Sequence, residues 1–115
     1  MERILEDQAR EIAEGRTGLA QDAQFHAAIG AASHNRAITR IAHAIMDLLA
    51  QSREDSLNTP GRPPLSHESH RRVLTAIRAR DGEAARLAMQ QHIESVEALV
   101  LGAEADGTRR GRPRA

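Results

Sequence analysis

The chain runs from residue 31 to 59, and again from 83 to 101, without a glycine or a proline. Such uninterrupted stretches favour helices, because glycine and proline are the residues that most often end them. The sequence is rich in alanine, leucine, isoleucine and glutamate, and Phe25 is its one aromatic residue. Strands favour aromatic side chains, so this composition argues against a sheet. We therefore predict an all-α fold.

Apolar residues recur at helical spacing in about five segments, which are residues 2–14, 17–33, 36–53, 66–80 and 83–101. A chain of 115 residues holds one domain with a modest core, so we expect an antiparallel bundle over residues 1–104. Between the third and fourth segments, the prolines and glycine of residues 54–65 predict a surface loop, after which Ser66 caps the next helix. Residues 105–115 are rich in arginine and predicted to be a disordered tail.

Composition also excludes several classes of function. The absence of cysteine rules out disulfides, thiolate metal sites and cysteine nucleophiles. No apolar run approaches the roughly 20 residues that cross a bilayer, and the N-terminus is acidic, so we expect a soluble, cytoplasmic protein without membrane contact. The 16 basic and 16 acidic residues balance, which argues against direct DNA binding by the body of the chain. The tail segment from Arg110 to Pro113 resembles a minor-groove AT-hook, although a solvated end is the simpler interpretation.

Four residues have a spacing that can hold a metal ion. Asp22 and His26 are four residues apart, so they lie one turn apart on the same face of a helix. His70 lies eleven residues before Asp81, at the predicted turn, and His92 lies eleven after it. At 1.5 Å per residue each histidine is roughly 16 Å from the turn, so antiparallel helices bring the two imidazoles level on their apolar faces.

Burying a carboxylate and three imidazoles without a partner would cost several kcal/mol per charged group, which a small core cannot offset. A divalent ion removes that conflict. Three imidazoles and one carboxylate favour Zn²⁺ or Ni²⁺, and Mn²⁺ or Fe²⁺ also fit where further oxygen ligands are available. Each histidine alone is more simply a core residue, and Asp22 alone is an acid in the first turn of a helix. The remaining histidines, His34, His43 and His67, are predicted to be surface residues.

Two strings of the sequence carry a resemblance to a known family. DAQFHAAIGAASHN, at residues 22–35, is followed by HRRVLTAIRARDGEAARLAMQQHI, at residues 70–93. Together they resemble the FCD domain, the C-terminal effector-binding domain of FadR-branch regulators in the GntR family. In that family an Asp and a His on one helix and two later His on a hairpin hold a divalent metal beside a small carboxylate effector. The pattern falls on Asp22, His26, His70 and His92.

The chain departs from the family in two ways. Nothing in it resembles the winged helix-turn-helix domain of these regulators, and the first effector-domain helices, which usually supply a pocket arginine, are not apparent. We therefore expect an N-terminally incomplete FCD-like domain that binds a metal and a small organic acid and forms a homodimer. A small metal-dependent hydrolase or oxygenase is an alternative, although no second catalytic carboxylate is evident near the site. A helical dimerisation module without metal is another.

Overall fold

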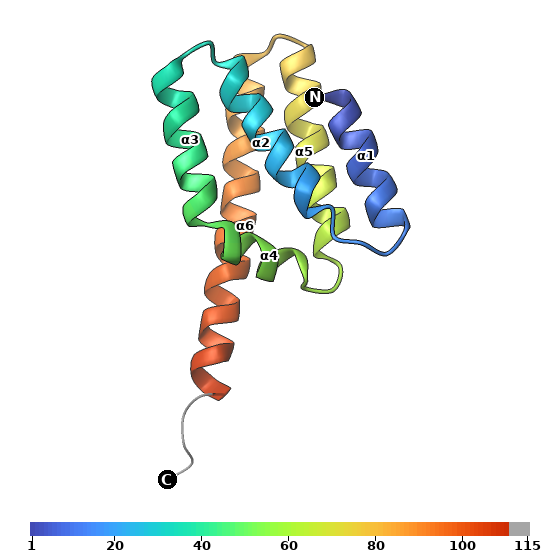
Figure 1. Cartoon of the computed structure of the whole chain (residues 1–115), viewed down its shortest axis with the longest axis vertical. Helices are drawn as coiled ribbons and strands as arrows, with labels where there is room; N and C mark the ends of the chain where they lie inside the picture. Colours follow the sequence, from blue (N-terminus) through green and yellow to red (C-terminus); the bar gives the residue numbers. More distant parts are fainter. Residues whose placement is uncertain (111–115) are drawn as a thin grey trace.

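The computed structural model describes the backbone of residues 1–110 and the side chains of residues 1–99, 101 and 102. Within this part the chain forms six α-helices and no strand (Figure 1), which confirms the predicted all-α class. The helices are α1 (Glu2–Ala13), α2 (Leu19–Ala32), α3 (Arg36–Leu48), α4 (Ala50–Leu57), α5 (Arg62–Arg78) and α6 (Gly82–Arg110). No helix of the described chain is both long and apolar enough to cross a membrane.

The bundle is organised around the α5–α6 hairpin, whose two helices make the most extensive packing contact in the fold. Helix α1 packs on α5 and α2, and α2 in turn packs on α3 (Figure 1). The short helix α4 runs across the lower part of the bundle and contacts α2, α3, α5 and α6. Helix α6 extends past the other helices at its C-terminal end, which gives the molecule a long axis of 57 Å.

The hydrophobic core lies where α1, α2 and α5 meet. Its fully enclosed members are Leu5, Phe25 and Val73, and the partly buried residues around them are Met1, Ile4, Ile29, Leu74, Ile77, Ala88 and Met89. Apart from Met1, these residues lie in segments that the sequence predicts to be helical, which correspond to α1, α2, α5 and α6. The core is small, so the polar groups buried beside it take up a large share of the interior.

The predicted third helix is divided in two, because α3 ends at Leu48 and α4 begins at Ala50. Arg53 spans this break, since its Nη2 atom donates a hydrogen bond to the carbonyl oxygen of Met46, 3.2 Å away. The bond satisfies a carbonyl near the end of α3 that has no partner within the helix. The predicted start of this helix at residue 36 is confirmed, and the Asn35 side chain caps it by accepting hydrogen bonds from the backbone N–H groups of Ala37 and Ile38.

The predicted surface loop at residues 54–65 is wrong in extent. Helix α4 continues to Leu57, and α5 begins at Arg62, four residues before the predicted cap. Pro63 and Pro64 fall in the first turn of α5, where a missing N–H group costs nothing because it would have no helical partner. Gly61 allows the tight entry with a φ of 80°, and Ser66 is a buried residue of the helix instead of its cap.

Helix α6 also continues beyond its predicted end at Leu101. Gly102 does not stop it, and the backbone stays helical to Arg110, since no proline occurs between Gly102 and Pro113. Residues 111–115 of the predicted tail, with most of the AT-hook-like segment, lie outside the described residues. The boundary proposed at residue 104 between domain and tail therefore stays a prediction.

Candidate metal centre

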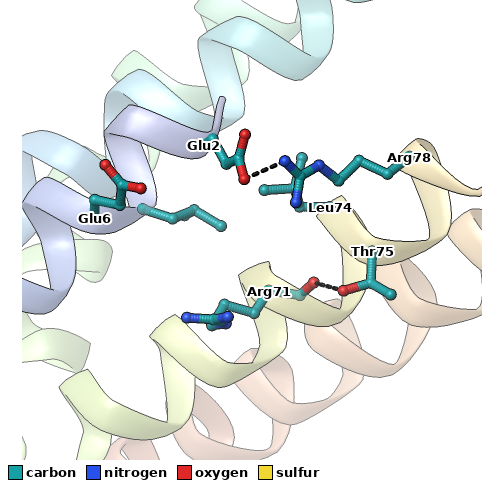
Figure 2. Close-up of a pocket in the computed structure, with 7 residues that line it drawn as sticks. Glu2, Glu6, Arg71, Leu74, Thr75 and Arg78 are labelled. Atoms are coloured by element: carbon teal, nitrogen blue, oxygen red, sulfur yellow. Dashed lines mark hydrogen bonds and ion pairs between the residues drawn. The ribbon is translucent and has the colours of Figure 1, made fainter.

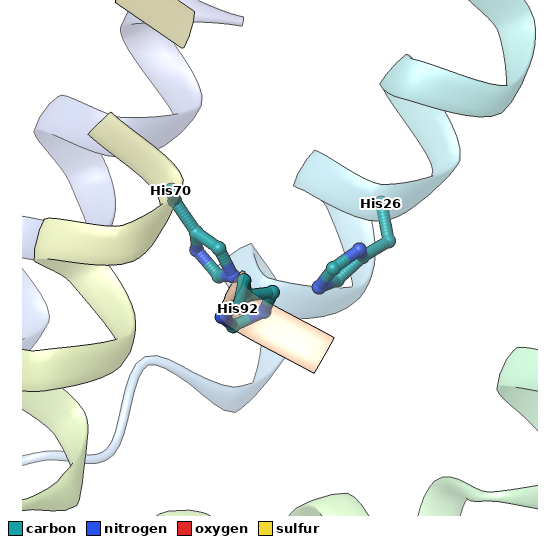
Figure 3. Close-up of side chains that lie close together, drawn as sticks. All are labelled: His26, His70 and His92. Carbon is teal, nitrogen blue, oxygen red and sulfur yellow. The ribbon is translucent and has the colours of Figure 1, made fainter. Parts of the chain in front are cut away.

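Three histidines from three helices converge inside the bundle (Figure 3). His26 comes from α2, His70 from α5 and His92 from α6, and each offers one ring nitrogen within 4.8 Å of the other two. His70 and His92 are buried, whereas the side chain of His26 retains 19% of its exposure. The cluster is thus enclosed on the hairpin side and open to solvent beside α2.

The hairpin places two of these imidazoles level, as the spacing around Asp81 predicts. The ring centroids of His70 and His92 are 4.7 Å apart. Two local features set this register. Arg80 adopts a left-handed φ of 55° in the turn, and Asp81 Oδ1 accepts a hydrogen bond from the backbone N–H of Ala84, which caps the start of α6.

Asp22 is buried next to the cluster and divides its two carboxylate oxygens between different partners. Its Oδ1 atom lies 3.3 Å from Nε2 of His70 and 3.6 Å from Nε2 of His26. Its Oδ2 atom accepts a hydrogen bond from Nη1 of Arg53 at 3.1 Å. Burial raises the pKa of Asp22, but the hydrogen bond and charge of His26 and the hydrogen bond from Arg53 outweigh this effect and lower the pKa below 3.8. The carboxylate is therefore ionised at neutral pH.

Gln8, on α1, determines which nitrogen of His70 carries the hydrogen. The Oε1 atom of Gln8 lies 3.1 Å from Nδ1 of His70, and both side chains are fully buried. A carbonyl oxygen can only accept, so in this orientation of the Gln8 amide Nδ1 is the protonated nitrogen and Nε2 presents a lone pair. That lone pair faces Oδ1 of Asp22. Gly18 makes room for Gln8, since a Cβ atom at this left-handed position would lie 3.0 Å from Gln8 Cγ.

The donor set fits a divalent cation. Burial is the main cause that lowers the pKa of His70 to about 3 and of His92 to about 4, so both imidazoles are neutral at pH 7. His70 Nε2 and His92 Nδ1 are buried without a hydrogen-bond partner in the described chain. Neutral imidazole nitrogens with free lone pairs beside an ionised carboxylate are the ligands that divalent transition metals prefer.

Sequence reasoning missed three polar residues around the centre, which are Gln8, Arg53 and Arg62. Gln8 lies one turn from Ile4, Leu5 and Ile12, so its place on the apolar stripe of α1 was a usable signal. Arg53 continues the four-residue spacing of Ile45 and Leu49. Arg62 gave no such signal, because it lies in a segment rich in proline and glycine.

The other histidines lie outside the cluster. His34 and His43 are exposed, as predicted. His67 was predicted to be a surface residue, but it is half-buried and its Nε2 atom lies 3.0 Å from the carbonyl oxygen of Leu5. The difference arises because α5 starts four residues earlier than expected, so His67 lies beyond the first turn and packs against α1.

A separate surface depression of about 100 Å³ lies between α1 and α5 (Figure 2). Its lining carries two acids, Glu2 and Glu6, and two arginines, Arg71 and Arg78. An ion pair joins Glu2 to Arg78 across one side. The charges of this depression balance each other, so it offers neither a cation nor an anion a net attraction.

The fold is thus an all-α bundle whose interior brings three histidines within reach of one metal ion. The chain belongs to the FCD domain family, whose model matches residues 1–95. It is thus an effector-binding domain of the GntR-type regulators, a family whose FCD domains bind effectors and dimerise. The family is regulatory and not enzymatic, which confirms the expectation that the chain is no enzyme and removes the hydrolase or oxygenase alternative.

One curated relative is the Uxu operon transcriptional regulator of Escherichia coli (strain K12). The two are 32% identical over 115 residues, an alignment that takes in 88% of this chain and 42% of the relative. The chain thus spans less than half the length of this relative. No solved structure matches it.

Proposed function

We propose that this chain is the sensor domain of a GntR/FadR-type transcription regulator, in which Asp22, His26, His70 and His92 hold a divalent metal beside a small carboxylate effector. Such an ion would supply a positively charged centre to which a carboxylate oxygen of the effector can bind. In a full-length regulator, effector binding would shift the geometry of attached DNA-binding domains in the cytoplasm. The family and the donor set support this function.

The observation that carries the proposal is the contact between His70 and Asp22. The unprotonated Nε2 of His70 and the ionised Oδ1 of Asp22 face each other at 3.3 Å in a buried site. Two lone pairs repel at this distance, and Nε2 of His70 is a buried acceptor without a donor, which costs about 1–3 kcal/mol. A cation between them would remove the repulsion, and His26 and His92 would supply the remaining nitrogen ligands.

Elemental analysis of the purified chain, compared with His70→Ala and His92→Ala variants, tests the metal. We expect about one Zn²⁺, Ni²⁺, Mn²⁺ or Fe²⁺ per wild-type chain, and loss of the metal and of its thermal stabilisation in both variants. His43→Ala is the matched control, because His43 is an exposed histidine on α3. An absence of metal from the wild type, together with no rise in melting temperature on adding Zn²⁺ or Ni²⁺, would contradict the proposal.

A second proposal, compatible with the first, is that α3 forms the contact between two copies of this chain. Its exposed face carries large apolar side chains, which are Ile38, Ile41, Ile45, Leu48 and Leu49. Leu48 is 83% exposed, which is unusual for a leucine among four other apolar residues. A second copy is the occupant that fits, because FCD domains dimerise and a symmetric dimer pairs one such face with itself.

A further inference from the structure

Among the side chains that the structure describes, Arg62 is a buried cation without a counter-ion. Arg62 is 5% exposed, and its Nη1 atom donates a hydrogen bond to Oγ of Ser95, a neutral partner, 3.1 Å away. The Nε atom is buried without a partner, and no described acidic side chain forms an ion pair with Arg62. A buried guanidinium that is not paired with an acid is costly, so its presence calls for an anion.

The bond to Ser95 places this guanidinium beside the metal centre. Ser95 lies three residues after His92 on α6, which is about 4.5 Å along the helix axis. The electrostatic effects agree with that position. The pKa of His92 is lowered mainly by burial and by His26, and the positive charge of Arg62 lowers it further. Burial lowers the pKa of Arg62 as well, and the charge of Asp22 opposes that effect.

Asp22 cannot serve as the missing counter-ion, because both of its oxygens already have partners. Oδ2 accepts the hydrogen bond from Arg53, and Oδ1 faces His26 and His70. With a divalent ion in the centre, the charges of the ion, Arg53 and Arg62 would exceed the single negative charge of Asp22. The interior therefore lacks negative charge on the side where Arg62 lies.

We propose that Arg62 binds the carboxylate of the effector, while Arg53 is a positioning residue that holds Asp22 for the metal. This assignment rests on the proposed function and gives the two arginines near the centre different roles. The effector would approach from the side of His26 and Arg53, the two members of the centre whose side chains remain 19% and 18% exposed. Arg62, which is hydrogen-bonded to Ser95 on α6, then meets the acid beside His92.

The test separates anion binding from metal binding in the full chain. Malonate is the probe, malonamide is its uncharged analogue, and inorganic phosphate represents a different oxyanion. Binding is measured from the melting temperature as a function of probe concentration, and metal affinity from competition with a chelating dye. The variants are Arg62→Met, Arg62→Lys and Arg53→Met, with Arg72→Met as control because Arg72 is an exposed arginine on the same helix as Arg62.

We expect malonate, but not malonamide, to stabilise the wild type. Arg62→Met should raise the apparent Kd for malonate by about tenfold or more, which is the value of a hydrogen bond to a charged group. Arg62→Lys should recover part of this loss, which shows that the charge and not the fold is responsible. Arg53→Met should instead weaken metal binding by about tenfold or more. Arg72→Met should change neither quantity.

Three outcomes would overturn the inference: equal malonate binding in Arg62→Met and Arg72→Met, equal stabilisation by malonamide, or a response to phosphate alone. The same titrations in the presence of a chelator separate this inference from the proposed metal function. Malonate binding that depends on Arg62 in a chain that never binds metal would support the arginine and contradict the metal centre. Normal metal binding, together with malonate binding that does not depend on Arg62, would support the metal centre and contradict the role of the arginine.

Discussion

Nδ1 of His70 lies 3.1 Å from Oε1 of Gln8, and the two side chains are fully buried between α5 and α1. This single hydrogen bond sets the tautomer of a histidine at the centre of the candidate site. Partners of this kind commonly orient metal-binding histidines and make them more basic. Gln8 thereby connects α1, which carries none of the four predicted metal ligands, to the chemistry of the site.

Replacing Gln8 with leucine should weaken metal binding by about 10–100-fold, because Nδ1 of His70 would lose its acceptor and the ring its fixed tautomer. The affinity is measured by dye competition, and nitrogen NMR of the metal-free chain reports the tautomer of His70. Gln24→Leu is the control, since Gln24 is exposed on α2. Equal affinities in the two variants, with an unchanged NMR spectrum of His70, would show that the Gln8 contact has no such role.

The metal-free chain should lose stability as the pH falls from about 6.5 towards 4. In the folded chain the pKa of His70 is about 3 and that of His92 about 4, against an ordinary value of 6.5. Because the folded values are the lower ones, unfolding takes up protons below pH 6.5, and the full stability is present only above it. Each histidine contributes a slope of up to about 1.4 kcal/mol per pH unit.

Urea unfolding with a chelator at pH 7.5, 6.0 and 5.0 measures this dependence. His92→Gln should reduce the slope by about half, because one of two proton-linked groups is removed. His43→Gln, at an exposed position, should leave the slope unchanged. The carboxylate of Asp22 does not contribute in this range, since its pKa lies below 3.8. A free energy of unfolding that stays constant between pH 7.5 and 5.0 would contradict the burial of neutral histidines.

Phe25→Ala should destabilise the fold by about 3–5 kcal/mol, which is the cost of removing a buried aromatic ring. Phe25 is fully buried and stacks on the ring of His70, with centroids 4.6 Å apart. Phe25→Leu should cost less, because it keeps most of the apolar volume. Chemical denaturation gives these values. Leu65→Ala is the control because Leu65 is an exposed residue of α5, and a loss there as large as in Phe25→Ala would mean that the core is not where we place it.

Ile41→Arg combined with Ile45→Arg should convert a dimer of this chain into a monomer. Ile41 is 59% exposed and Ile45 is 48% exposed on the apolar face of α3, so the added charges would lie inside the proposed contact. Sedimentation equilibrium measures the mass. His43→Arg adds a charge to the opposite face of the same helix and should leave the dimer intact. A wild type that remains monomeric at high micromolar concentration would contradict this interface.

The sequence by itself determined the all-α class and the level pair of histidines. Both follow from local regularities, because the 3.6-residue repeat fixes which residues share a face and the distance from the Asp81 turn fixes which residues of a hairpin meet. The place of His26 beside this pair was also predictable, but only from the resemblance of the sequence to the FCD family. The full ligand set with Asp22 stays a prediction.

Only the tertiary structure decided which polar residues surround the centre. Gln8 reaches His70 because α1 packs on α5, a pairing of segments sixty-two residues apart that no local pattern encodes. Arg53 reaches Asp22 because the helix is interrupted at Leu49 and the following helix, α4, packs against α2. Periodicity states which face of a helix is buried, whereas the partner of that face depends on how the whole bundle minimises unpaired buried groups.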